Sequence, residues 1–196
     1  IATVGATTFC QGGSVTLLAS NAPAGMTYTY QWRLNGTAIT GATSNTYVAN
    51  ASGNYSVTIT TNSGCAATSA ATTVTVNPLP VLAANTGSAS VCENGTVTLA
   101  NAQAGGLWST ANNTIATINA VTGLVTGVNP GTTTLTYTFT NANGCTNSVS
   151  TNFTVNALPA AVITANGSTT FCQGGSVVLT ANAGSSYLWS NGQTTQ

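Results

Sequence analysis

The chain has almost no charged side chains. Its 196 residues include one cation, Arg33, and one carboxylate, Glu93, and they contain no histidine, lysine or aspartate. Catalysis by proton transfer or nucleophilic attack normally needs groups that carry a proton or a charge near neutral pH. Glu93 aligns with Gln11 of a repeated segment, which indicates a turn position, and Arg33 is expected to be a solvated strand residue. We therefore expect a protein that is not an enzyme, with no catalytic residue and no cofactor.

The shortage of charge also excludes several kinds of partner. The chain has no basic patch for nucleic acid or for an anionic membrane surface. No apolar run approaches the roughly 18 residues of a membrane helix. Clustered carboxylates for calcium and histidines for zinc are missing. We expect no bound metal, no nucleic-acid partner and no membrane insertion.

Cysteine is present, although no pair has the close spacing of a metal-binding motif. The five cysteines are spread along the chain as Cys10, Cys65, Cys92, Cys145 and Cys172. This usage favours disulfides formed in an oxidising compartment, and so an extracellular or cell-surface location. The odd count predicts that at least one disulfide partner lies outside this sequence. The chain also starts abruptly, and we expect it to be a segment of a larger exported protein.

The remaining composition indicates short β-strands. Hydrophobic residues make up 42% of the chain, threonine and valine are abundant, and glycine and asparagine separate the candidate strands. Apolar residues alternate with polar ones, as at Val15 and Leu17, at Tyr55 and Val57, and at Leu135 and Tyr137. About seven such strands with one early tryptophan predict an immunoglobulin-like sandwich.

The sequence repeats. Residues 7–15 recur unchanged as residues 169–177, and a looser copy surrounds Cys92. The copies lie about 80 residues apart, which is the size of a whole small domain. The short joints Asn-Pro-Leu-Pro at 77–80 and Asn-Ala-Leu-Pro at 156–159 are semi-rigid. We expect an all-β linear array of tandem immunoglobulin-like (Ig-like) sandwiches. Its domains are residues 1–78, residues 79–157 and, as the truncated N-terminal half of a third domain, residues 158–196.

Particular motifs carry a family resemblance. In the second repeat, Trp-Ser at 108–109, Ile-Ala-Thr-Ile at 115–118, Gly-Leu-Val-Thr-Gly-Val-Asn-Pro-Gly at 123–131 and Leu-Thr-Tyr at 135–137 resemble the bacterial Ig-like group 2 family. The other repeats share Phe-Cys-Gln-Gly-Gly-Ser-Val and Tyr-x-Trp, and the first adds Gly-Asn-Tyr-Ser-Val at 53–57 and Ser-Gly-Cys at 63–65. These motifs resemble the Ig-like repeats of large secreted Bacteroidota surface proteins and adhesins. The resemblance implies stalks, spacers or adhesins and no catalytic residue.

The pairing of the cysteines has two interpretations. Even spacing favours one bridge inside each domain, Cys10–Cys65 and Cys92–Cys145. In an Ig-like sandwich, however, Cys10 precedes a strand and Cys65 follows one that runs in the same direction. The two would lie more than about 20 Å apart, whereas a disulfide needs Cα atoms within about 7 Å.

The inter-domain bridge Cys10–Cys145 is therefore slightly favoured. Cys65 would by the same argument bridge to a preceding domain, and Cys92 to the third domain.

Three functions remain open. The leading hypothesis is a non-catalytic structural or adhesive repeat segment of a long exported cell-surface protein, whose partners are neighbouring Ig-like repeats. The second is a subunit region of a self-assembling extracellular fibre or sheath, with lateral contacts to other copies, because no charge guards the sheet edges. The third is a carbohydrate-binding module of a secreted enzyme that binds surface glycans. Trp32, Trp108 and Trp189 occupy equivalent core positions, so a row of exposed tyrosines such as Tyr28, Tyr30 and Tyr47 would have to bind sugar.

Overall fold

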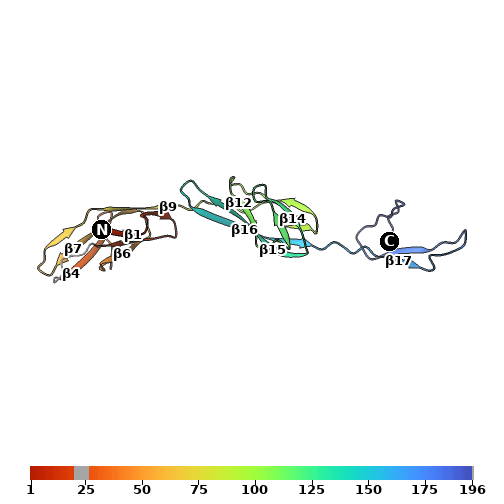
Figure 1. Ribbon diagram of the computed structural model, residues 1–196, viewed down its shortest axis with the longest axis horizontal. Coiled ribbons are helices and arrows are strands. Elements are labelled where there is room, and N and C mark those ends of the chain that lie inside the picture. Colours follow the sequence, from red (N-terminus) through yellow and green to blue (C-terminus); the bar gives the residue numbers. More distant parts are fainter. Residues whose placement is uncertain (20–26, 196) are drawn as a thin grey trace.

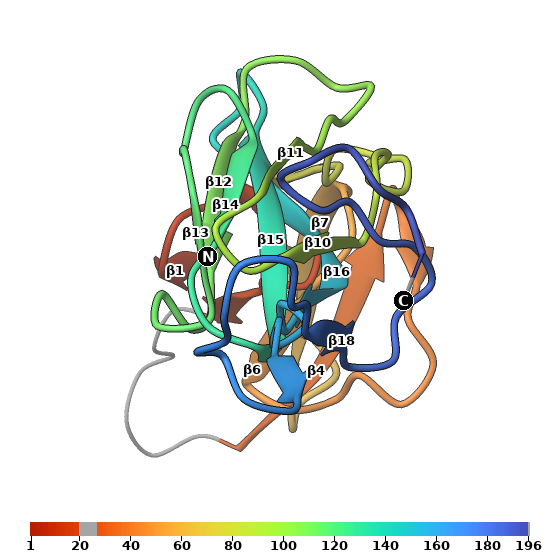
Figure 2. The same cartoon turned by 90° about the vertical axis from the view of Figure 1, so that its right-hand side faces the viewer.

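The molecule is an extended array of β-structure. The structure, a computed structural model, describes residues 1–19 and 27–195, which form strands β1–β18 and no helix. The strands form three successive groups along the long axis (Figure 1), and each sheet takes its strands from one group only. Figure 2 looks along that axis, so the groups lie one behind the other. Within the described residues, no helix is long and apolar enough to cross a membrane. The predicted all-β fold and linear array are confirmed.

The first group forms a sandwich of two sheets, called the first sandwich below. One sheet has the order β1 (Ala2–Val4), β3 (Val15–Leu18) and β6 (Thr46–Ala49). The other has the order β2 (Thr8–Cys10), β9 (Thr72–Asn77), β7 (Gly53–Thr61), β4 (Tyr28–Leu34) and β5 (Thr37–Ala38), with β8 (Ala66–Thr68) also paired to β7. Strand β2 runs parallel to β9 and places Cys10 opposite Asn77. This pairing brings the Cys10 thiol to the end of the sandwich from which the chain leaves.

The core of the first sandwich is apolar and contains no cysteine. Leu17, Trp32, Tyr55 and Val57 are buried between its sheets. The Tyr55 hydroxyl donates a hydrogen bond of 3.0 Å to the carbonyl of Ala51, which is the tyrosine corner of immunoglobulin domains. Two residues beyond that tyrosine, antibody domains carry one cysteine of their inter-sheet disulfide. Here that position is the buried Val57, so this disulfide is absent from the core and the cysteines lie at the ends.

The second group forms the second sandwich. One sheet has the order β10 (Ser90–Cys92), β16 (Thr146–Asn156), β15 (Gly131–Thr140) and β12 (Leu107–Thr110). The other has the order β11 (Thr96–Thr98), β14 (Leu124–Gly127) and β13 (Ala116–Ile118). Trp108, Leu135 and Phe153 are buried in its core. Strand β10 runs parallel to β16, so Cys92 lies opposite Asn156, just as Cys10 lies opposite Asn77.

The C-terminal segment, residues 158–195, contains one pair of strands. β17 (Ile163–Asn166) and β18 (Val178–Ala181) are antiparallel. Leu179 corresponds to Leu17 through the identical segments 169–177 and 7–15. Leu17 is fully buried, whereas Leu179 is 44% exposed. Within the described residues, no second sheet covers this part of the chain.

Candidate functional site: the disulfide-bonded joint

The joint between the sandwiches begins with a turn at residues 10–13, called the Cys10 turn. The amide of Gln11 donates to the carbonyl of Asn77 at 2.8 Å, and the amide of Gly13 donates to the carbonyl of Cys10 at 2.9 Å. A Cβ at Gly13 would lie 3.1 Å from the Cys10 carbonyl oxygen, so the turn favours glycine there. The turn therefore holds the Cys10 side chain beside the start of the linker.

The opposite half of the joint is a hairpin between β15 and β16, called the 141–145 hairpin. The amide of Asn141 donates to the carbonyl of Cys145, and the amide of Gly144 donates to the carbonyl of Asn141, both at 2.9 Å. The Oδ1 atom of Asn141 accepts hydrogen bonds from the amides of Asn143 and Cys145, each at 3.0 Å. Gly144 has φ of +77°, a left-handed conformation suited to glycine in a three-residue hairpin loop. One asparagine side chain thus organises the tip that carries Cys145.

A disulfide closes the joint. Cys10 and Cys145 are bonded with their Cα atoms 5.5 Å apart and 135 positions apart in sequence. Cys145 is fully buried. The same Asn141 side chain donates through Nδ2 to the carbonyl of Pro78 at 3.1 Å. The hairpin of the second sandwich therefore contacts both the Cys10 turn of the first sandwich and the linker.

The linker also lies against the second sandwich. Asn147 donates through Nδ2 to the carbonyl of Pro80 at 2.9 Å. Asn101 donates in the same way to the carbonyl of Ala83 at 2.9 Å. Leu79 is half-buried beside these contacts. Side-chain amides thus bind linker carbonyls, which fixes the path of the chain between the sandwiches.

The other cysteines carry free thiols and are exposed. They are Cys65, Cys92 and Cys172. The structure therefore contains the inter-domain bridge Cys10–Cys145 and neither of the alternative bridges, Cys10–Cys65 and Cys92–Cys145. The linker-binding role of Asn141 and Asn147 was not predicted. Asparagine is common in this sequence, so the signal for this role was weak. Only a comparison of the two hairpins, in which Thr61 stands at the place of Asn141, distinguishes Asn141.

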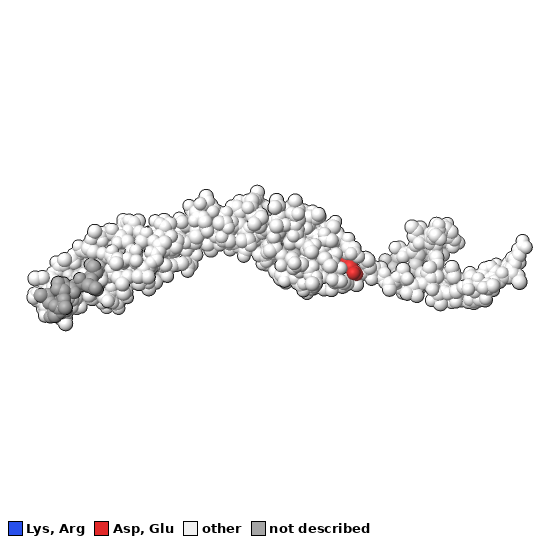
Figure 3. Space-filling view, viewed as in Figure 1, with Lys and Arg blue, Asp and Glu red and all other residues white. Residues whose placement is uncertain are grey.

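The two charged residues form no reactive site. Arg33, on β4, donates through Nε to the Thr58 hydroxyl and through Nη1 to the carbonyl of Gly36, both at 3.1 Å. Glu93 lies in the turn after β10, as its alignment with Gln11 predicts, and its amide donates to the carbonyl of Asn156. Figure 3 shows one face of the molecule with a single acidic group near the C-terminal segment and otherwise no charge. Residues 1–19 and 27–195 contain no cluster of side chains that could hold a metal ion.

The aromatic residues mostly serve the cores. Trp32 and Trp108 are buried, and Trp32 donates through Nε1 to the carbonyl of Ser44 at 2.9 Å. The Tyr47 ring lies 5.9 Å from that of Trp32 and 5.7 Å from that of Tyr55. Burial raises the pKa of the Tyr55 hydroxyl above its usual 10.0, and the neighbouring Tyr47 adds to this shift. Among the described aromatic side chains only Phe171 is exposed, and Tyr28, Tyr30 and Tyr47 are partly buried.

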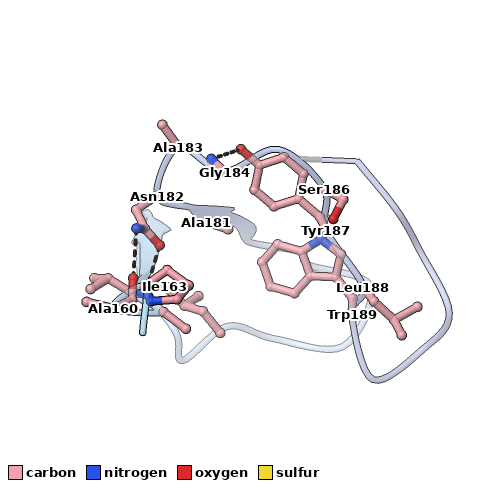
Figure 4. Close-up of a pocket in the computed structure, with 13 residues that line it drawn as sticks. Ala160, Ile163, Ala181, Asn182, Ala183, Gly184, Ser186, Tyr187, Leu188 and Trp189 are labelled. Carbon is pink, nitrogen blue, oxygen red and sulfur yellow. Dashed lines mark hydrogen bonds between the residues drawn. The ribbon is translucent and has the colours of Figure 1, made fainter. Parts of the chain in front are cut away.

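The C-terminal segment contains a hollow of about 280 Å³. Figure 4 shows Tyr187 and Trp189 projecting over it from one loop, opposite Ile163 and Ala181. The Gly184 amide donates to the Tyr187 hydroxyl at 2.8 Å. Trp189 corresponds to the buried Trp32, so the hollow lies on the face that forms the core of the first sandwich. We interpret it as an uncovered core face and assign no ligand to it.

Comparison with known proteins finds a family match for the first repeat. Residues 1–78 match the family described as "Ig-like domain CHU_C associated". No curated protein matches the chain. The motif-based resemblance to bacterial Ig-like repeats is confirmed, and this family of domains is typically non-catalytic.

Solved structures with Ig-like or fibronectin-like folds are similar to this chain. A C-terminal intimin fragment in complex with the intimin-binding domain of its translocated receptor is 16% identical, with a TM-score of 0.34, over 85% of this chain and 67% of that one. The fibronectin(III)-like modules of Clostridium thermocellum CbhA are 11% identical, with a TM-score of 0.34, over 76% and 89%. A calcium-stabilised adhesin with which an Antarctic bacterium binds ice is 16% identical, with a TM-score of 0.38, over 78% and 46%. At these identities and TM-scores the likeness carries no conclusion about this chain.

Proposed function

We propose, from the premise that this chain consists of bacterial Ig-like repeats, that it is a non-catalytic structural segment of a long exported cell-surface protein. In this proposal the domains are residues 1–78, 79–157 and 158–196, and they hold an adhesive region away from the cell. An extracellular location agrees with the disulfide, which persists in oxidising surroundings. The observation that carries the proposal is the position of that disulfide, across a joint rather than inside a sandwich.

The disulfide changes how the chain carries a pulling force. Tension applied at the two ends passes along the shortest covalent route, which crosses directly from Cys10 to Cys145. The residues between them, which include β3–β9 and β10–β15, lie outside that route. The strands between the two cysteines are thus shielded from the pull, while β1, β2 and β16 stay in the loaded route. A stalk that resists shear would benefit from this arrangement, whereas an enzyme or a small-ligand carrier would not.

Single-molecule pulling of the full chain between its ends tests the proposal. Extended chain spans about 3.3–3.6 Å per residue, so the oxidised chain should lack roughly 450 Å of the unfolding length that the reduced chain shows. Cys145→Ser should release the same length without reductant, and Cys65→Ser should release none. Equal unfolding lengths in the oxidised and reduced chains would contradict a load-bearing role for this joint.

A fibre or sheath is the second candidate, and the edges of one sheet favour it. Strands β1 and β6 are the edges of the first sheet, and neither carries a charge. Val4 is 63% exposed and Val48 is 56% exposed on them. Charged residues normally prevent such edges from pairing. Sedimentation with the thiols alkylated should then show association that increases with concentration, and Val48→Lys should abolish it; a monomer at every concentration would exclude this candidate.

A further inference from the structure

The two sandwiches differ beside one pair of equivalent strands. Strand β6 of the first sandwich pairs antiparallel with β3, and β14 of the second sandwich pairs antiparallel with β11 in the same way. When the repeats are aligned on their turn cysteines, these pairings place Ala49 of β6 at the position of Val125 of β14. Val48 of β6 is therefore the counterpart of Leu124 of β14.

In the second sandwich a further strand covers β14. Strand β13 pairs with β14 antiparallel, and the amide of Asn119 extends this ladder by donating to the carbonyl of Leu124 at 2.8 Å. Ala116 of β13 is fully buried, Ile118 packs against the core, and Thr117 between them is exposed. The strand that closes this sheet is thus short and uncharged, and its apolar residues lie on either side of a threonine.

In the first sandwich no strand covers β6 within residues 1–19 and 27–195, and β6 is the last strand of its sheet. The segment before β6 joins the other sheet instead, where β5 pairs with β4 and the amide of Ile39 donates to the carbonyl of Trp32 at 2.9 Å. The amide of Ala19 donates to the carbonyl of Asn45, which faces β3. Because backbone groups alternate in direction along an antiparallel strand, those of Val48 point to the open edge.

A hollow of about 350 Å³ lies along this open edge. The loop at 39–44 lines it on one side, and Thr46, Tyr47 and Val48 of β6 line it on the other. Apart from the phenol of Tyr47 no lining side chain is ionisable, and Val48 is 56% exposed. The hollow therefore offers an uncharged segment both backbone hydrogen bonds and apolar contact.

We propose that the open edge of β6 binds an extended segment of a partner protein that has the chemistry of β13. That segment is uncharged, at least three residues long, and places apolar side chains on either side of a threonine. It adds to the sheet as an antiparallel strand, so its backbone bonds to Val48 and its apolar side chains face the hollow. Backbone pairing of this kind supplies affinity, and the alternate side chains supply specificity.

The absence of charge agrees with this use of the edge. Charged side chains normally prevent a sheet edge from taking up another strand, and β6 carries none. The second sandwich has no such need, because β13 already covers its equivalent strand. The binding activity goes beyond the structural role proposed above and does not depend on the disulfide-bonded joint.

A synthetic peptide with the sequence of residues 113–119, which includes β13, tests the proposal. The full chain, dilute and with its free thiols alkylated, is titrated with this peptide while hydrogen exchange is followed at single amides. At saturation the peptide should slow exchange of the Val48 amide by about tenfold or more, because a bonded amide exchanges only when it opens. The amide of Thr3, which by the same alternation points to the open edge of β1, should be unchanged.

Matched variants separate strand addition from unspecific adsorption. In the peptide, Thr117→Pro removes the amide at the residue that pairs with Thr126 in the second sandwich, and it should weaken binding about tenfold. Thr117→Ala keeps that amide and should bind like the parent peptide. In the chain, Val48→Pro should abolish binding, whereas Val48→Thr should preserve it. The peptide variants leave the chain itself unchanged, so their result stands whether or not Val48→Pro folds.

Three results would overturn the proposal: no saturable binding, protection of Thr3 in place of Val48, or equal binding of the two peptide variants. Protection of the Val48 amide that increases with chain concentration when no peptide is present would also overturn it, because the occupant would then be a second copy of the chain. None of these results bears on the pulling experiment across Cys10–Cys145, so this proposal and the structural role fail separately.

Discussion

The two joints of this chain share most of their parts and differ in outcome. At the first, the Cys10 turn and the linker at 77–80 meet the 141–145 hairpin, a disulfide forms and Leu79 is half-buried. At the second, the turn at residues 92–95 has the same hydrogen bonds and the linker at 156–159 has nearly the same sequence. Yet Cys92 stays free and Leu158 stays exposed. In the closed joint, the hairpin of the following repeat supplies the second thiol and the amide donors to the linker.

The closed joint shows which of the two neighbouring repeats contributes each part. The upstream repeat contributes a thiol and a row of carbonyl acceptors, while the downstream repeat contributes a second thiol and the amide donors of Asn141 and Asn147. Proline suits positions 78 and 80 on the acceptor side, because its backbone offers a carbonyl acceptor and no amide donor. The first and second repeats thus each carry one cysteine turn and one cysteine hairpin.

The largest expected effect is the loss of the covalent bond at the first joint. Cys145→Ser should lower the free energy of unfolding by about 2–4 kcal/mol, because the bridge restrains a long segment of the unfolded chain. Urea unfolding, read separately for each sandwich by hydrogen exchange, measures this. The matched change at the open joint, Cys92→Ser, should have no measurable effect. Equal effects of the two variants would refute the assignment of the closed joint.

The next effect concerns the side chain that links hairpin and linker. Asn141→Ala removes two acceptor contacts within the hairpin and one donor contact to Pro78, and it should cost about 1–2 kcal/mol. Thr61→Ala, at the equivalent place in the hairpin at residues 61–65, should cost about 0.5 kcal/mol because those groups are exposed to water. Chemical denaturation of both variants with the disulfide intact provides the comparison. Equal losses for the two variants would show that Asn141 acts only within its own hairpin and that its contact with Pro78 contributes nothing.

The linker leucines offer a smaller contrast. Leu79→Ala removes a half-buried side chain and should cost about 1 kcal/mol. Leu158→Ala acts on a side chain that is 53% exposed and should change stability by less than about 0.5 kcal/mol. Thermal unfolding of the two variants beside the parent chain measures the difference. If Leu158→Ala proved equally costly, the second joint would already be packed in solution.

The smallest effect appears only at high pH, and it concerns the core of the first sandwich rather than its joint. Because burial raises the Tyr55 pKa above 10.0, the folded state holds that proton more tightly than the unfolded state does. The stability this contributes is fully present below pH 10 and is lost as pH rises through the higher folded pKa. Urea unfolding from pH 8 to pH 11, with free thiols alkylated, should show the loss in the parent chain and not in Tyr55→Phe. A pH dependence unchanged by Tyr55→Phe would assign it to another group.

Local patterns were sufficient to predict the architecture. The alternation at Val15 and Leu17 and at Leu135 and Tyr137 predicted which side chains are buried, because successive strand residues face opposite sides of a sheet. The repeated segments around Cys10, Cys92 and Cys172 indicated equivalent turns. The linker contacts of Asn141 and Asn147 could not be predicted, because they join residues more than 60 positions apart through side chains that are common along the whole chain.

The amino-acid sequence by itself determined that this protein is all-β, repeated, nearly uncharged and equipped with one cysteine turn for each repeat. Strand propensity, period-two alternation and glycine turns act over a few residues, so they can be deduced without a fold. Only the tertiary structure decided that Cys10 bonds to Cys145 while Cys65 and Cys92 remain free. That choice depends on which ends of successive sandwiches meet, and a disulfide forms only where the folded chain brings two Cα atoms within a few ångströms.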